Sequence, residues 1–135
     1  MKLLFNHVAR FAFEVTDQTT VGPNLATDQR SGGTGEAVLV KVCTEAGDSD
    51  ATVEAAAAEI RDVCTEIGVE TLVLFPWAHL SRDLADPAAA RSRLADLDSE
   101  LESAGYVVQS VPFGWYKSWE LESKGHPMSV LSRSV

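Results

Sequence analysis

The sequence has 135 residues, of which 45% are hydrophobic and 23% charged, and its formal net charge at pH 7 is −9. This length and composition predict one globular domain over residues 1–135, and the acidic balance argues against non-specific binding of nucleic acid. No apolar run has the length of a membrane span and no signal-peptide pattern follows the first residues, so we expect a cytoplasmic protein. Cys43 and Cys64 lack metal-ligand spacing, so we expect no metal site.

The first third of the chain predicts strands and one long loop. Residues 2–8 are predicted as a buried strand. Residues 10–15 alternate apolar and polar side chains, which predicts a second strand or a continuation of the first after a bend. Residues 16–35 are rich in Thr, Gly, Pro, Asn and Asp and predict a loop. Residues 36–44 then predict a strand.

The middle of the chain alternates helices and strands. Helices are predicted over residues 50–67 and 87–104, each followed by a glycine that can end it. Strands are predicted over residues 71–75 and 106–111. This order implies parallel strands joined by right-handed crossovers, so the fold class is α/β with a parallel βαβαβ core. An antiparallel hairpin is expected at the end of the chain.

Candidate functional residues follow the predicted parallel strands. Ligands collect at the carboxyl edge of such sheets, where three strand ends would meet: residues 43–44, 76–79 and 112–114. His79 would lie at this edge, although a helix-entry histidine bonded to a backbone carbonyl is an alternative interpretation. His7 lies in a buried strand and is expected to be a core histidine with its hydrogen bonds satisfied.

Residues 111–127 concentrate aromatic and basic side chains. Pro112 stops strand pairing, Gly114 permits a turn, and the strand that follows places Lys117 on the same side as two tryptophans. The alternative is a solvated lysine with a cation–π contact.

The charge is distributed unevenly along the chain. Residues 1–104 carry 8 Lys and Arg against 18 Asp and Glu, whereas residues 105–135 carry 3 against 2, so only the latter part does not repel a phosphate backbone.

Several motifs together carry a family resemblance. Residues 75–81 (FPWAHLS), 112–117 (PFGWYK) and 124–127 (KGHP), with Leu131-Ser132-Arg133, resemble the amino-terminal editing domain of archaeal threonyl-tRNA synthetases, in the same order over essentially the whole chain. The resemblance implies a three-layer α/β/β domain of the D-aminoacyl-tRNA deacylase-like fold, usually a homodimer and without a cofactor. It implies hydrolysis of serine from wrongly charged threonine tRNA, with help from the 2′-hydroxyl of the terminal adenosine.

The resemblance also assigns site residues. Lys117 and His79 would be the catalytic side chains, with the Lys117 ammonium binding the substrate or the developing oxyanion. Six residues would line the substrate pocket, partly through backbone groups: Pro76, Trp77, Ala78, Phe113, Gly114 and Tyr116.

The chain departs from the family pattern at two places. The family commonly has Ser-Asp where this chain has Val8-Ala9, and a Glu in a helix after Gly-His-Pro where this chain has Val130. Two other functions therefore stay open: a non-catalytic module that binds the tRNA acceptor end or supports a dimer, and a D-aminoacyl-tRNA deacylase. The expected partners are tRNA(Thr), a second copy of the chain and the catalytic part of threonyl-tRNA synthetase.

Overall fold

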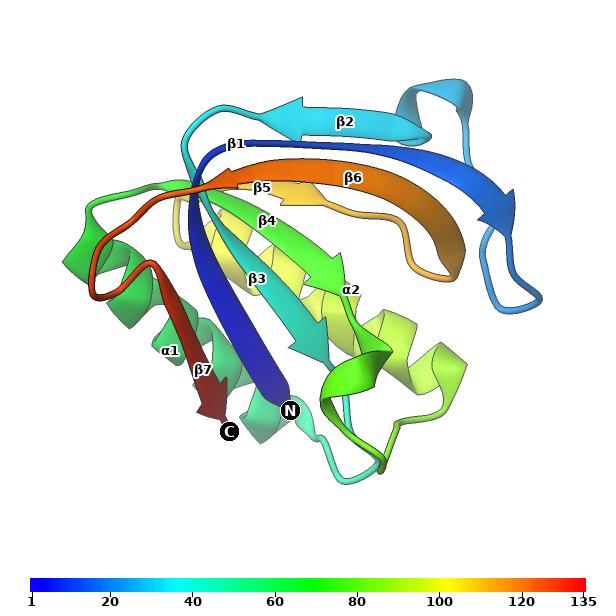
Figure 1. Cartoon of the computed structure of the whole chain (residues 1–135). Coiled ribbons are helices and arrows are strands. Elements are labelled where there is room, and N and C mark those ends of the chain that lie inside the picture. The colour runs from blue at the N-terminus through cyan, green and yellow to red at the C-terminus, as the bar shows by residue number, and fades with distance from the viewer.

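A bent sheet covered on one face by two helices makes up the fold (Figure 1). The computed structural model describes residues 1–135. The strands are β1 (Lys2–Gln18), β2 (Ser31–Thr34), β3 (Ala37–Cys43), β4 (Thr71–Pro76), β5 (Val107–Ser110), β6 (Trp115–Ser123) and β7 (Val130–Ser134). The helices are α1 (Asp50–Ile67) and α2 (Pro87–Ser103), with short 3-10 helices η1 (Thr27–Gln29) and η2 (Ala78–Leu80). Neither α-helix is long and apolar enough to cross a membrane.

The parallel core is as predicted from the sequence. β3 pairs with β4 and β4 with β5, both in parallel, and α1 and α2 make the two crossovers. The start of α2 follows from Asp86, whose Oδ1 accepts the backbone N–H of Ala88 at 2.9 Å. Gly68 ends α1 with φ +80°, a conformation that glycine adopts without a Cβ penalty.

β1 is a single long strand that belongs to both halves of the sheet. Its first half, Lys2–Val8, pairs antiparallel with β3, and β7 pairs on its other side. Its second half pairs with β2 and with β6. The register shifts between Val8 and Arg10, where the strand bends. Of the two interpretations of residues 10–15, the continuation after a bend is therefore correct.

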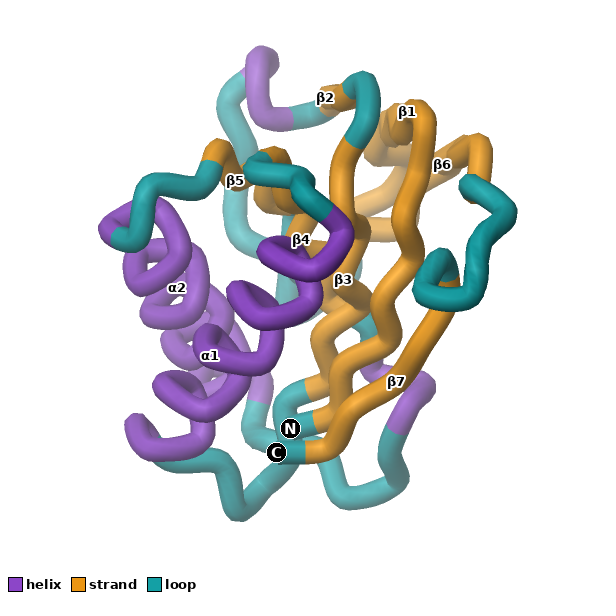
Figure 2. The backbone as a smooth tube through the Cα atoms, turned by 90° about the vertical axis from the view of Figure 1, so that its left-hand side faces the viewer, coloured by secondary structure: helices purple, strands orange, loops and turns teal.

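Two hydrophobic cores lie on opposite faces of the β7-β1-β3-β4-β5 sheet. The first fills the space under the helices, which both lie on one side of the strands in Figure 2. It includes Leu3, Phe5, Val40, Ile60, Leu72 and Leu97. The second lies between this sheet and the layer of β2, β1 and β6 above it in Figure 1, and contains Val8, Phe11, Phe13, Ala37, Leu39, Val73, Phe75 and Val111. The result is the expected α/β/β arrangement.

The predicted loop over residues 16–35 is wrong at both ends. β1 continues to Gln18, and Ser31–Thr34 forms β2. The glycines of β2 permit close approach rather than a turn: a Cβ on Gly33 would lie 2.8 Å from the carbonyl oxygen of Phe11. The predicted terminal hairpin also differs, because β6 and β7 both pair with β1 and not with each other. Val130, expected in a helix, opens β7.

Gly33→Ala tests this close packing of β2 on β1. The added Cβ would press on backbone, which cannot move aside as a flexible side chain can. We expect the free energy of unfolding to fall by about 1–3 kcal/mol, as in other overpacked sites, when measured by chemical denaturation. Gly35→Ala is the control, because a Cβ there meets nothing within 4 Å, and it should change stability by no more than about 0.5 kcal/mol. Equal effects of the two changes would contradict the pairing.

Candidate functional site

A pocket of about 310 Å³ lies where the chain leaves β4 and enters β6. Its lining residues are Thr19, Phe75, Pro76, Trp77, Ala78, His79, Gly114, Trp115, Tyr116, Lys117 and Trp119. All the predicted site residues are among them except Phe113, which lines a neighbouring cavity of about 590 Å³ that also contacts Pro76. The topology thus brings together residues that are far apart in the sequence.

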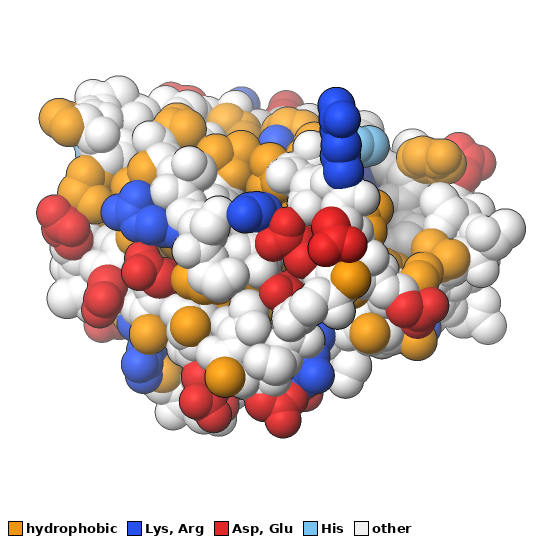
Figure 3. All heavy atoms as spheres, turned by 90° about the horizontal axis from the view of Figure 1, so that it is seen from below, with side chains coloured by type: hydrophobic (Ala, Val, Ile, Leu, Met, Phe, Trp, Pro, Cys, Tyr) orange, Lys and Arg blue, Asp and Glu red, His pale blue; other side chains and the backbone are white.

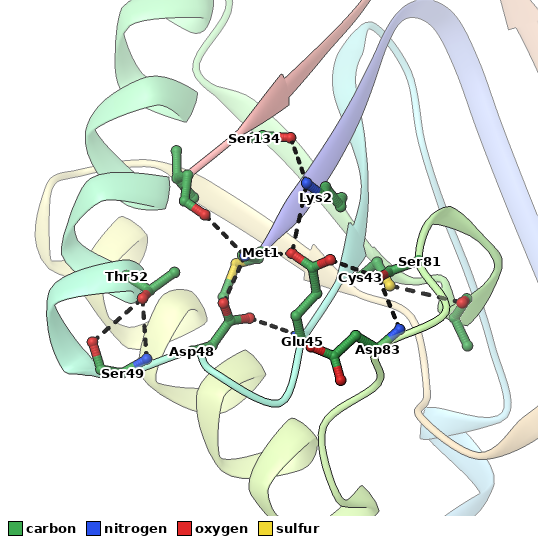
Figure 4. Close-up of polar contacts among 12 residues, drawn as sticks. Met1, Lys2, Cys43, Glu45, Asp48, Ser49, Thr52, Ser81, Asp83 and Ser134 are labelled. Atoms are coloured by element: carbon green, nitrogen blue, oxygen red, sulfur yellow. Dashed lines mark hydrogen bonds and ion pairs between the residues drawn. The ribbon is translucent and has the colours of Figure 1, made fainter.

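The segment that carries His79 is fastened to the end of β3. The backbone N–H of Trp77 donates to the carbonyl oxygen of Val42 at 2.8 Å. Further along, the Ser81 hydroxyl donates to Glu45 Oε1 at 2.6 Å, in a polar cluster that joins the loops after β3 and η2 (Figure 4). This hydrogen bond lowers the pKa of the Glu45 carboxyl, which therefore stays ionised and keeps its acceptor role. The η2 segment is held in place by both bonds.

The opposite wall is fixed by residues of the loop after β1. Both the N–H and the hydroxyl of Thr19 donate to the carbonyl oxygen of Gly114, at 3.0 and 2.6 Å. Gly114 has φ +68°, and a Cβ on it would lie 2.5 Å from the Cα of Gly22. The indole N–H of Trp115 donates to the Pro23 carbonyl at 2.8 Å. Sequence reasoning missed Thr19, and the only signal for it is the turn-forming Gly22-Pro23 pair that follows.

Lys117 lies in the pocket, where it contacts a backbone carbonyl and an aromatic ring. Its Nζ donates to the Pro112 carbonyl oxygen at 2.7 Å and lies 5.3 Å from the centre of the Phe75 ring. Burial lowers the pKa of Lys117 to about 8, so the ammonium is still the main form at neutral pH. One N–H is engaged by Pro112, which leaves the other two for a ligand. As the alternation along its strand predicts, Lys117 lines the pocket together with Trp115 and Trp119, whereas the cation–π contacts with Trp77 and Trp119 belong to Lys41.

His79 and Tyr116 face the solvent side of the pocket. The His79 ring packs edge-on against Trp77, with ring centres 5.7 Å apart. It makes no hydrogen bond within the chain, so the alternative of a ring bonded to a backbone carbonyl is wrong. Tyr116 is 67% exposed. Both side chains are therefore accessible to a ligand.

His7 lies outside the pocket in a hydrogen-bonded cluster, as predicted for a core histidine. Its Nδ1 is 2.7 Å from Nε2 of His126, and its Nε2 is 3.0 Å from Glu36 Oε1. Lys124 also pairs with Glu36. No group of three or more His, Cys, Asp and Glu side chains converges as metal ligands.

The chemistry that the pocket offers is charge stabilisation. An ammonium, an imidazole and a phenol meet at an opening whose lining contains no carboxylate. Such a set can bind an ester and stabilise a developing oxyanion, but it lacks the serine, histidine and acid arrangement of a nucleophilic hydrolase.

Solved structures define the class of fold. The structure of c-Myc DNA unwinding element binding protein matches with a TM-score of 0.73 at 12% identity, covering 100% of this chain and 99% of that one. The structure of a probable eukaryotic D-amino acid tRNA deacylase matches with a TM-score of 0.52 at 13% identity, covering 98% of each chain. The fold is therefore of the D-aminoacyl-tRNA deacylase-like class.

The family is shown by sequence. Residues 1–135 match the archaea-specific editing domain of threonyl-tRNA synthetase. Threonine–tRNA ligases of Thermofilum pendens, Methanothrix thermoacetophila and Thermococcus kodakarensis are 41%, 40% and 36% identical over all of this chain, which covers 22% of each of them. The chain belongs to this editing-domain family. It is an aminoacyl-tRNA deacylase domain, which confirms the class inferred from the motifs.

Proposed function

We propose that residues 1–135 act as one editing domain that hydrolyses serine from Ser-tRNA(Thr) and spares Thr-tRNA(Thr). The main support is the position of Lys117, whose ammonium has free N–H donors inside a pocket that holds most of the family's expected site residues. An aminoacylation site for threonine cannot exclude the smaller serine, because one methyl group gives only about 1–3 kcal/mol of discrimination. A second, hydrolytic site therefore has a physical purpose.

Hydrolysis of the ester requires water to attack the carbonyl carbon. The oxygen of the attacking water forms the new bond, the bond to the 3′ oxygen of the terminal adenosine breaks, and a proton passes to that oxygen. Lys117 would stabilise the negative charge on the carbonyl oxygen, and backbone groups of the walls would orient the substrate. No carboxylate lines the pocket to act as a base, which supports a role for the neighbouring 2′-hydroxyl in positioning the water.

A homodimer and the rest of threonyl-tRNA synthetase are the proposed protein partners. Large apolar side chains stay exposed near the pocket and on β7: Tyr116 at 67%, Trp119 at 38% and Val130 at 57%. An interface between two copies would cover such side chains. The synthetase would charge the tRNA, either in the same chain or as a separate one.

The substrate proposal is tested by hydrolysis of Ser-tRNA(Thr) and Thr-tRNA(Thr) side by side. We expect turnover of the seryl ester and little of the threonyl ester, because the pocket must distinguish the two for proofreading to work. D-Ser-tRNA(Thr) is the third substrate. Faster hydrolysis of the D-form would assign the domain to D-amino-acid removal, and no hydrolysis of any ester would make it a binding module.

The role of the terminal 2′-hydroxyl is tested with tRNA that ends in 2′-deoxyadenosine and carries serine on the 3′ oxygen. We expect this substrate to bind with unchanged affinity and to be almost inert in single-turnover assays, because the water would lose its positioning group. Normal turnover would move the catalytic role to a protein base. His79, the only imidazole in the pocket, would then be the first candidate.

Lys117→Met removes the ammonium but keeps the stem. We expect deacylation to fall by about 10²-fold or more, as when a charge-stabilising donor is lost elsewhere. The fold should persist: because burial lowers the pKa of Lys117, the folded state disfavours this charge, and its removal should leave the melting temperature unchanged or higher.

The pH dependence of the deacylation rate distinguishes a Lys117 that acts as a cation from one that acts as a base. With a pKa of about 8, the ammonium is lost as pH rises through that value, so the ratio of the parent rate to the Lys117→Met rate should fall there. Using this ratio cancels the alkaline hydrolysis of the ester and the titration of its amino group. A ratio that rises above pH 8 would instead mark Lys117 as a base. Lys124→Met is the control, because it removes a lysine that pairs with Glu36 outside the pocket. The ratio of the parent rate to the Lys124→Met rate should not change as pH rises through 8.

A further inference from the structure

Lys41 is held at the corner between two indole rings beside the pocket. It lies on β3, and its Nζ is 4.0 Å from the centre of the Trp77 ring and 4.6 Å from that of Trp119. The two rings stand almost perpendicular, at 89°, with centres 6.1 Å apart. Each face attracts the cation, so the two rings fix the ammonium in one position without neutralising its charge.

The ammonium of Lys41 has no anionic or other polar partner in the chain, unlike those of the other three lysines. Their partners are Ser134 for Lys2, the Pro112 carbonyl for Lys117 and Glu36 for Lys124. Two carboxylates on the neighbouring segments are already engaged, Glu120 by Arg10 and Glu45 by Ser81. A half-buried cation without a counter-charge is destabilised by desolvation, and the burial of Lys41 indeed lowers its pKa. The three N–H donors are thus available to an external anion.

The position of Lys41 relative to the pocket indicates which part of a ligand it would meet. Trp77 and Trp119 line the pocket, whereas Lys41 does not. Its ammonium therefore lies outside the pocket but within 5 Å of the ring centres of two side chains that line it, so it is placed to meet a part of the ligand that extends beyond the pocket. Two aromatic rings with a cation between them are the composition that proteins use to hold single-stranded nucleic acid, by stacking and by phosphate contact.

We propose that Lys41, held by Trp77 and Trp119, binds a backbone phosphate of the tRNA acceptor end while the terminal aminoacyl ester occupies the pocket. The inference rests on the proposed function, which brings this RNA end to the pocket. The chain has a net charge of −9, and on the lower face drawn in Figure 3 acidic side chains are interspersed with basic ones. Because the chain has only 11 Lys and Arg against 20 Asp and Glu, one fixed and uncompensated cation would have a correspondingly large share in holding the phosphate.

The test uses two non-hydrolysable probes: 3′-serylamino-3′-deoxyadenosine and the same compound with a 5′-phosphate. Calorimetry should show that the parent chain binds the phosphorylated probe about tenfold more tightly. Lys41→Met should lose this preference and bind the unphosphorylated probe as the parent does. Lys41→Arg should keep the preference, since it retains the charge and its affinity for aromatic faces. Lys124→Met, the charge-matched control outside the pocket, should keep it too.

Binding of whole tRNA gives a second measure. For Lys41→Met, the slope of log affinity against log salt should decrease in magnitude by about 0.7, the value for one phosphate contact on a single strand. A phosphate preference that survives in Lys41→Met would overturn the proposal, even if the parent hydrolyses Ser-tRNA(Thr). Loss of the dimer in Lys41→Met, with the phosphate preference intact, would assign the ammonium to a carboxylate of a second copy. Failure of the parent to hydrolyse any aminoacyl-tRNA would count against the proposed function instead.

Discussion

β1 is the element on which the rest of the structure depends, because it pairs with four other strands. Its first half completes the sheet that packs under α1 and α2, and its second half forms the layer above. The bend after Val8 lets Phe11 and Phe13 face back onto Leu39 and Val73, which closes the second core. A strand of this kind couples the two layers: a shift in its register would move β6, and with it Lys117, relative to the parallel strands.

The pocket is the consequence of that coupling. β4 and η2 belong to the parallel sheet, whereas Lys117, Tyr116 and Trp119 belong to β6 on the upper layer. The two sides meet only because β6 lies along the second half of β1 and because the turn at Gly114 is pinned to Thr19. This arrangement places two cations close together in a chain that is acidic as a whole: Lys117 within the pocket, and Lys41 against two of the tryptophans that line it.

The local pattern of the sequence predicts the parallel core well, because the apolar face of each helix and the apolar run of each buried strand are visible in consecutive residues. Asp86 and Gly68 mark helix ends by local chemistry that no tertiary contact overrides. Gly33 illustrates the limit, because composition cannot tell a glycine that turns the chain from one that lets another strand approach. Long-range pairing is the second limit. Alternation placed Lys117 beside tryptophans of its own strand, but only the packing of β6 over β3 shows that Lys41 meets the indoles.

The two departures from the family pattern have different physical meanings. Val8 is fully buried in the second core, where a polar residue would need a partner, so the apolar side chain there suits the packing. Val130 is 57% exposed, so no such packing constraint accounts for it, and it lies on β7 opposite Asn6, outside the pocket. The pocket lining contains no carboxylate, so under the proposed function the amino group of a seryl ester would meet the Lys117 ammonium without a compensating charge. That repulsion would favour the neutral amine, and because an α-amino group titrates near pH 8, this form would be accessible at cellular pH. Under the proposed function, selection of the ester would then rest on its shape and its carbonyl oxygen, with the amine bound uncharged.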